Sequence, residues 1–236
     1  MSEFWTYGPS DFLLFSPRVY YRQFELHNQA LWPAQIIALG LGVTLFFLVL
    51  RPSPVRSRVV AAILGLLWVW VGWIFVWQRY TTINWVAAYA VPLFMMQGAL
   101  LLAAAATRNG LDIEKEWTFI RGFALALLLF TLFFYPLLAP LWGRSWQAAE
   151  IFGIAPDPTA LATLAVVALS RSRIRWPLMI VSALWCAITG ATLWAMAAPD
   201  FWVAPICALV ALTVRWTARR PTPRRYRHRN VPHCDV

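Results

Sequence analysis

Long apolar runs recur along the chain, separated by polar or arginine-rich sequence, and they restrict the possible folds more than any other feature. The runs that we predict to be helical cover 30–50, 59–78, 84–107, 122–142, 158–170, 176–198 and 201–216. About 20 apolar residues in an α-helix cross the hydrocarbon core of a bilayer. The composition agrees, because 61% of the residues are hydrophobic and only 13% are charged, against roughly 25% charged in soluble domains. We therefore predict an all-α, polytopic membrane protein with a single helical membrane domain over 30–216.

The distribution of basic residues predicts the orientation of these segments. Every second loop, together with the C-terminal tail, holds sixteen of the 20 Lys and Arg residues, and the remaining loops with the N-terminus hold four. Loops rich in Lys and Arg stay in the cytoplasm. We therefore expect seven transmembrane helices with a periplasmic N-terminus and a cytoplasmic C-terminus, in the inner membrane. The use of arginine almost to the exclusion of lysine suggests GC-rich codons and a bacterial source.

The fifth run leaves an alternative open. Residues 158–170 number only 13, which in a helix covers roughly 20 Å of a core about 30 Å thick. The alternative to seven spans is six spans with a re-entrant fifth segment.

Both ends of the chain are expected at the membrane surface. In the N-terminal segment 1–29, Ser16 is suited to cap a helix and Pro17 to begin one. We predict an interfacial helix that bends near Pro33 into the first span, and a second interfacial helix over 146–155. The basic tail, 217–236, is expected on anionic lipid headgroups, together with the arginine-rich loops. The net charge of +10 is thus assigned to lipid rather than to nucleic acid.

Three stretches resemble a family of bacterial multi-pass membrane proteins that is known only as a domain of unknown function. They read FSPRVYYRQFELHNQALWPAQ (15–35), WQRYTTINWVAAYAVPLFMMQG (77–98) and FGIAPDPTALATLAVVAL (152–169). The resemblance runs over most of the chain and implies a helical membrane fold. It implies no activity and no cofactor.

Polar residues from distant segments fall on the side predicted to be outside. The set comprises Asn28, Gln35, Arg79, Asn84 and Asp157. An unpartnered polar side chain is costly in lipid, so these groups should face protein or water. We interpret them as contacts of a substrate-binding pocket, in which Arg79 pairs with Asp157 or Glu150. The simpler interpretation is a set of polar caps that tie helix ends together at headgroup level.

Other polar and aromatic residues favour structural roles. Gln97 is expected to form an interhelical hydrogen bond. Trp70, Trp73 and Trp77 recur at helical spacing and are more typical of packing and of the interfacial belt than of a ligand wall. Cys186 and Cys207 are expected to act as small apolar residues, not as a metal or redox pair.

The sequence contains little that indicates catalysis. No metal-ligand spacing, nucleophile elbow or phosphate-binding loop occurs, and no charged residue is expected in the middle of a span. We predict no catalytic residue, metal or cofactor. The leading hypothesis is binding or transport of a small polar solute from the outer face. The alternative is an accessory or structural subunit that packs against a membrane-protein partner, and a membrane-embedded enzyme that uses Asp157 or Glu150 as a base is least favoured.

Overall fold

The computed structural model describes residues 15–107 and 110–217, and every regular element in them is helical. The α-helices are α1 (Pro17–Ala30), α2 (Ala34–Leu50), α3 (Pro54–Val71), α4 (Ala90–Ala106), α5 (Phe119–Leu129), α6 (Leu138–Leu141), α7 (Pro156–Ala168), α8 (Arg175–Ala195) and α9 (Val203–Thr217). The π-helical and 3-10 turns that extend or join them are η3 (Gly72–Trp77), η4 (Tyr80–Thr82), η5 (Trp85–Tyr89), η6 (Phe130–Phe134), η7 (Tyr135–Leu137) and η8 (Trp146–Ala148). The all-α prediction is confirmed for this part of the chain.

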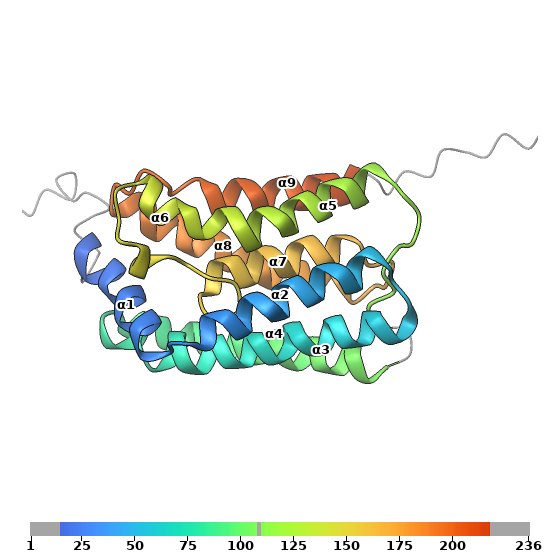
Figure 1. Ribbon diagram of the computed structural model, residues 1–236, viewed down its shortest axis with the longest axis horizontal. Helices are drawn as coiled ribbons and strands as arrows, with labels where there is room; N and C mark the ends of the chain where they lie inside the picture. Colours follow the sequence, from blue (N-terminus) through green and yellow to red (C-terminus); the bar gives the residue numbers. More distant parts are fainter. Residues whose placement is uncertain (1–14, 108–109, 218–236) are drawn as a thin grey trace, which may run out of the picture.

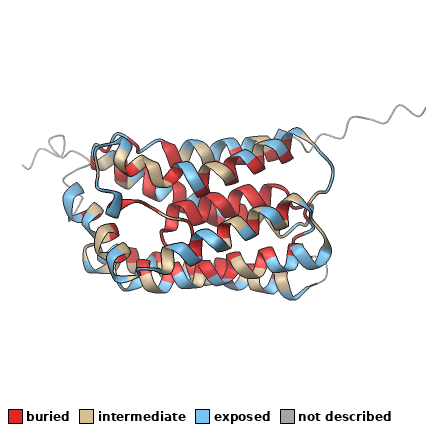
Figure 2. Ribbon diagram, in the orientation of Figure 1, coloured by how far each residue is buried: buried red, intermediate tan, exposed pale blue. Residues whose placement is uncertain are grey.

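The short helix α7 forms the core of the bundle (Figure 1). It packs against α3, α5, α8 and α9, and all 13 of its residues are buried (Figure 2). Its side chains are mostly small or aliphatic on every face, which is the pattern of a helix enclosed by others. The fifth apolar run is therefore surrounded by protein, so its length does not have to match the thickness of a bilayer.

Within residues 15–107 and 110–217, four helical stretches are long and apolar enough to cross a membrane. They are Pro54–Thr82, Trp85–Ala106, Phe119–Leu141 and Arg175–Ala195. A fifth is obtained if α1 and α2 are counted as one span, although they meet at a bend of 92°. The helix α9 is apolar but shorter, and α7 is not among these stretches. The structure thus supports four or five membrane-spanning helices by length and composition.

Large apolar side chains cover much of the outer surface of the bundle. Examples that are 59–65% exposed are Ile36, Ile37, Phe47, Leu66, Ile180 and Leu209. Soluble monomers rarely expose contiguous apolar areas of this kind. The pattern of a closed core with an apolar exterior is compatible with a membrane protein.

Two glycines and one side-chain amide mediate contacts between the long helices. The Cα atoms of Gly65 and Gly98 face each other where α3 crosses α4, and a Cβ on either would come within about 3 Å of the other's carbonyl oxygen. Such close backbone approach is typical of helix pairs in membranes. Gln97, also on α4, donates to the carbonyl oxygen of Leu178 (2.9 Å) and to the hydroxyl of Ser182 (3.1 Å) on α8. The predicted interhelical bond is confirmed.

The loops gather at two opposite ends of the bundle. At the first, which we call the arginine end, the loop before α5 pairs with the loop after α7 through Ile113 and Ser170, and Arg171 forms an ion pair with Glu114. At the second, which we call the α1 end, α1 packs against η8 and Arg144 pairs with Asp200 in the turn between α8 and α9. The arginine-rich loops therefore lie together in space, as the alternation of charge predicts.

The start of α1 follows the sequence prediction, whereas residues 1–14 of the predicted N-terminal segment 1–29 lie outside the described residues. Ser16 accepts a hydrogen bond from the backbone amide of Val19 and caps α1, and Pro17 is the first helical residue. The bend into α2 falls at residues 31–33, between the two helices. As Figure 1 shows, α1 lies across the end of the bundle rather than along it.

Two predictions about the segment before α7 are wrong. Residues 146–155 form only the single turn η8 followed by a loop, not an interfacial helix. Most of this loop is buried, because it turns into the bundle and fills the space at the N-terminal end of the short helix α7. Asp157 is consequently inside the protein rather than at its rim.

Candidate functional site

The carboxylate of Asp157 is held by side chains from two other parts of the bundle. The indole of Trp185 donates to Oδ1 at 2.7 Å and the hydroxyl of Thr189 donates to the same oxygen at 2.9 Å. The phenol of Tyr135 donates to Oδ2 at 3.2 Å. All four residues are buried. Three donors to one carboxylate compensate part of the cost of removing its charge from water.

The carboxylate of Asp157 contacts the middle of α8, which is the longest α-helix among the described residues. Trp185 is ten residues from either end of α8, or roughly 15 Å along the helix axis. Asp157 stands in the first turn of α7 and not in the middle of a span, but the inward turn of the preceding loop carries its carboxylate to this depth. A charged group at this position in an apolar bundle is a functional-site hypothesis in its own right.

A second acidic residue, Glu150, lies in the loop that leads to α7. It is 9% exposed, and its Oε2 has no hydrogen-bond partner among the described residues. Burial, and then the negative charge of Asp157, raise the pKa of Glu150 well above its ordinary value, whereas Arg144 opposes the shift. Burial therefore favours the protonated form of Glu150 more than in a solvent-exposed glutamate. Two carboxyl groups share this interior, and Arg144 is already paired with Asp200.

His27 on α1 belongs to the same end of the molecule. Its ring is 1% exposed and packs edge-on against Phe75, with ring centroids 5.1 Å apart. Burial lowers the pKa of His27 to about 4, and the positive charge of Arg79 adds to the effect. His27 is therefore neutral above about pH 5 and provides no counter-charge for the carboxyl groups.

The structure brings together two of the five residues predicted to form a pocket. The side-chain amide of Gln35 donates to the carbonyl oxygen of Asn28 at 2.7 Å. The amide of Asn28 in turn donates to the carbonyl oxygens of Gln147 (2.7 Å) and Ala149 (2.8 Å). The bend between α1 and α2 creates this contact, so it does not depend on a continuous helical face.

The other three predicted residues lie apart from that pair. Asn84 accepts from the backbone amide of Val86 and caps η5. Arg79 is partly buried near His27, and among the described residues it forms no ion pair with Asp157 or Glu150. The predicted Arg79–carboxylate pair is therefore absent from this part of the chain. Asp157 belongs to the interior group described above.

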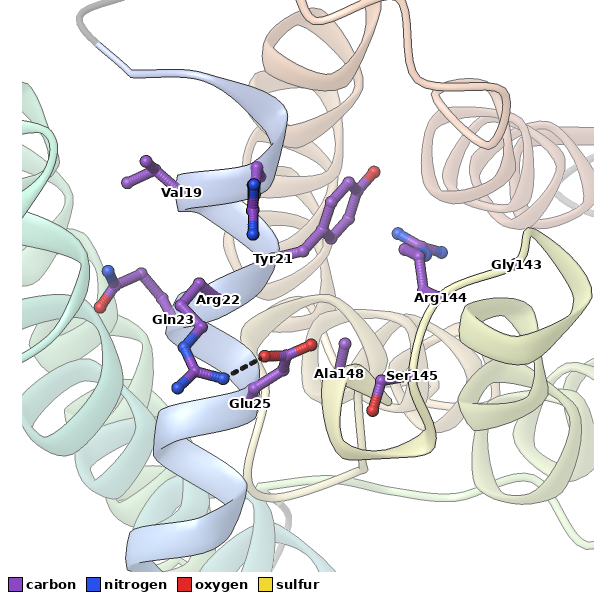
Figure 3. Close-up of a pocket in the computed structure, with 10 residues that line it drawn as sticks. Val19, Tyr21, Arg22, Gln23, Glu25, Gly143, Arg144, Ser145 and Ala148 are labelled. Atoms are coloured by element: carbon purple, nitrogen blue, oxygen red, sulfur yellow. Dashed lines mark hydrogen bonds and ion pairs between the residues drawn. The ribbon is translucent and has the colours of Figure 1, made fainter.

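Two surface hollows flank the contact between α1 and η8. The larger, about 710 Å³, lies between α1 and the loop at residues 143–148. In Figure 3, Tyr21 and Arg144 face each other across this hollow, and Arg22 is held by Glu25 on its own helix. The guanidinium of Arg144 stacks on the ring of Tyr21 at 4.2 Å. Most of the charged side chains that line this hollow are thus paired within the protein.

The smaller hollow, which we call the amide hollow, has a different lining. Its volume is about 370 Å³, and it is lined by Asn28, Gln29, Trp32, Gln35, Trp146, Gln147 and Ile151. None of these lining residues is charged. The predicted residues Asn28 and Gln35 therefore do line a pocket, together with residues of η8 that sequence reasoning did not select.

Sequence reasoning missed the partners of Asp157 and the burial of Glu150. Tyr135, Trp185 and Thr189 occur in apolar runs where aromatic and Thr residues are common, so no local pattern distinguishes them. The one signal of this site in the sequence was the presence of two acidic residues, Glu150 and Asp157, in a segment of small residues that includes Gly153. Among the described residues, no group of three His, Cys, Asp or Glu side chains could hold a metal ion.

Comparison with known proteins places the chain in a family without assigning an activity. The model of a family of unknown function, DUF6064, matches residues 17–225. No curated protein and no solved structure matches the chain. The matched range includes α1, the amide hollow and the buried carboxyl groups, so these features lie within the family's own domain. The chain belongs to the DUF6064 family.

Proposed function

We propose that this protein is a multi-pass protein of the bacterial inner membrane that binds a small polar solute from the periplasmic side. The N-terminus would be periplasmic and the C-terminus cytoplasmic, so that the arginine end faces the cytoplasm and the α1 end faces outward. The excess of basic residues at the arginine end supports this orientation.

The amide hollow is the single observation that carries the proposal of binding. It combines two aromatic side chains with four carboxamides. The carboxamides are fixed in place by hydrogen bonds to one another and to the backbone. Small-molecule sites are typically apolar hollows with a few oriented polar groups of this kind.

The packing of the core favours binding over transport. A transporter is expected to have a polar-lined cavity that reaches near the middle of the membrane. Asp157 lines none of five hollows at the surface of the described part of the chain. The centre of the bundle is occupied by α7, whose residues are all buried.

A second function, as accessory subunit of a membrane complex, is favoured by an aromatic face. Trp70, Trp73 and Trp77 are 41–50% exposed, and the last two stack with centroids 6.3 Å apart. Such a face could pack against another membrane protein. Purification in native lipid followed by mass spectrometry tests this function, which predicts a stoichiometric partner that is lost when these tryptophans are changed to Leu.

Labelling of single cysteines tests the proposed topology. Cys186, Cys207 and Cys234 are changed to Ser, and one cysteine at a time is introduced at Thr82, Trp142 or Arg173. Residues 82 and 142 should react with a membrane-impermeant maleimide in intact cells, and residue 173 only after permeabilisation. Because Trp142 and Arg173 precede and follow α7, accessibility of both from one side would reject the seven-span topology.

Thermal unfolding with added solutes tests the proposed binding. The protein is screened against a broad set of small polar molecules, and Gln35→Leu is compared with Gln78→Leu, an exposed glutamine outside the amide hollow. A solute that raises the midpoint of the wild type should lose its effect in Gln35→Leu and keep it in Gln78→Leu. Equal protection of both variants would contradict the site.

A further inference from the structure

The lining of the amide hollow excludes charge as the basis of recognition. Of its seven lining residues, four are carboxamides, two are tryptophans and one is Ile151. A charged ligand would have no opposite charge to pair with in this lining, and its desolvation would be uncompensated. The occupant should therefore be neutral.

The carboxamides provide both donors and acceptors in fixed positions. Gln29 donates to the side-chain oxygen of Gln147 at 2.7 Å, which leaves the amide hydrogens of Gln147 free of that bond. The donor group of Gln35 is engaged by the carbonyl oxygen of Asn28 and its Oε1 is enclosed by protein, so Gln35 holds Asn28 in position rather than facing a ligand. Each primary amide has two donor hydrogens and one acceptor oxygen with two lone pairs. A ligand hydroxyl is likewise both donor and acceptor, so hydroxyl groups match this lining.

The two tryptophans supply flat apolar surface beside these polar groups. Trp32 is 69% exposed and Trp146 is 64% exposed. They come from the bend after α1 and from η8, two segments far apart in the sequence. Aromatic rings give rigid contact area at small entropic cost, and the C–H face of a sugar ring is the complementary surface. A volume of about 370 Å³ is near the lower end of the roughly 300–1,000 Å³ typical of small-molecule pockets.

We propose that the amide hollow binds a neutral sugar, with a face of the ring on Trp32 or Trp146 and hydroxyl groups on Asn28 and Gln147, which Gln35 and Gln29 hold in position. This names the ligand class of the solute site proposed above and rests on that function. The sugar comes either from solution or from the headgroup of a glycolipid, since both present the same chemistry at a membrane surface.

Saturation-transfer NMR with defined probes tests the proposal. The protein is purified in phosphatidylglycerol nanodiscs without any sugar-headed detergent, because such a detergent would fill the site. The probes are methyl glucoside, methyl galactoside and methyl N-acetylglucosaminide, with glycine, choline and methyl phosphate as comparisons that carry charged groups. At least one glycoside should receive saturation from the protein, and the charged probes should not.

Two matched pairs of variants localise any binding. Trp32→Ala is compared with Trp85→Ala, which removes a tryptophan that is 61% exposed outside the hollow. Gln35→Leu is compared with Gln78→Leu. We expect the Kd of the bound glycoside to rise at least about tenfold in Trp32→Ala and in Gln35→Leu, and to change less than about twofold in the two controls. Each of the four variants should unfold at the thermal midpoint of the wild type, which would show that it is folded.

A glycolipid arm separates the two sources. Native mass spectrometry of nanodiscs that contain monoglucosyl diacylglycerol should show retained glycolipid if the site takes a lipid headgroup, and the free glycosides should then compete for it. Retention without competition, or in Trp32→Ala as well as in the wild type, would overturn the proposal. If no glycoside binds but a charged solute does and needs Gln35, the sugar assignment fails while the solute site stands. If no probe binds, both fail.

Discussion

The two ends of the bundle bury charged groups in different ways. At the arginine end, Arg121 is 2% exposed and its two NH groups donate to the backbone carbonyl oxygens of Leu50 (2.7 Å), Glu114 (2.7 Å), Lys115 (3.1 Å) and Val49 (3.4 Å). At the α1 end, Asp157 is held by three side-chain donors, and nearby Glu150 has an oxygen without a partner among the described residues.

The difference distinguishes a buried charge that completes the structure from a buried charge that belongs to a preorganised site. The carbonyl groups at the end of α2 carry partial negative charge and lack intrahelical donors, so Arg121 completes a helix that would otherwise end unsatisfied. The groups around Asp157 are side-chain donors from η7 and α8 and not the end of a helix backbone. They hold a charged group in the interior. We infer that the arginine end serves assembly and orientation, and that the α1 end serves recognition.

The largest effect is expected when the buried carboxylate is removed. Asp157→Ala would leave Trp185, Thr189 and Tyr135 without an acceptor, and each unsatisfied buried donor costs about 1–3 kcal/mol. We expect a loss of about 4 kcal/mol in the free energy of unfolding, measured by denaturation in detergent micelles. The exposed Asp112→Ala at the arginine end is the control and should change stability by less than about 0.5 kcal/mol. An unaltered Asp157→Ala protein would show that these contacts do not hold the bundle.

A somewhat smaller effect is expected at Arg121. Arg121→Met keeps most of the apolar stem but leaves the carbonyl groups at the end of α2 without donors, at a cost of about 3 kcal/mol. Arg58→Met removes an exposed donor to a single carbonyl oxygen, that of Ala105, and should cost less than about 1 kcal/mol. If the two variants lose equal stability, Arg121 is not the cap that distinguishes this end.

His27 predicts how acid affects the α1 end. Its folded-state pKa of about 4 lies below the ordinary value of 6.5, so the unfolded chain binds the proton more tightly. The contribution of the neutral His27 to the free energy of unfolding is then fully present above pH 6.5, and it is lost as the pH drops from 6.5 towards 4. The linkage amounts to about 2 kcal/mol at pH 5.

The comparison of His27→Leu with the wild type isolates this dependence. The variant should lose about 2 kcal/mol less than the wild type between pH 8 and pH 5 in equilibrium unfolding. The remaining slope belongs to the acidic residues and is common to both proteins. Identical pH profiles would contradict the burial of a neutral His27.

The smallest effect is expected from single hydroxyl groups. Thr189→Val removes one of three donors to Asp157 and should cost about 1 kcal/mol. The matched change Thr131→Val removes a buried hydroxyl that donates to the carbonyl oxygen of Leu127, one turn earlier in the same helical stretch, and should be near neutral. Thermal midpoints of the two variants give the comparison directly, and equal values would show that the carboxylate does not depend on Thr189.

Several features of the fold follow from the sequence because they depend on local properties. Apolar run length predicts the helices, the Ser16–Pro17 pair predicts the start of α1, and a lone amide in an apolar run, Gln97, predicts an interhelical bond. The alternation of arginine-rich loops predicts that those loops share one end of the molecule. Each of these inferences needs only the nearest residues or the energetics of a single group in an apolar medium.

The tertiary structure alone decided the remaining features. The depth of Asp157 depends on the loop at 149–155 turning inward, and that turn exists because α7 is enclosed and too short to fill the bundle. Asn28 reaches Gln35 through a bend, and Gln147 joins them from a segment 119 positions away from Asn28 in the sequence. Periodicity and composition report which face of a helix is apolar, but they do not report which distant segment fills the space beside it. That choice is made by packing, because every helix of this bundle offers similar apolar surface and only the complete arrangement fixes the neighbours of each polar group.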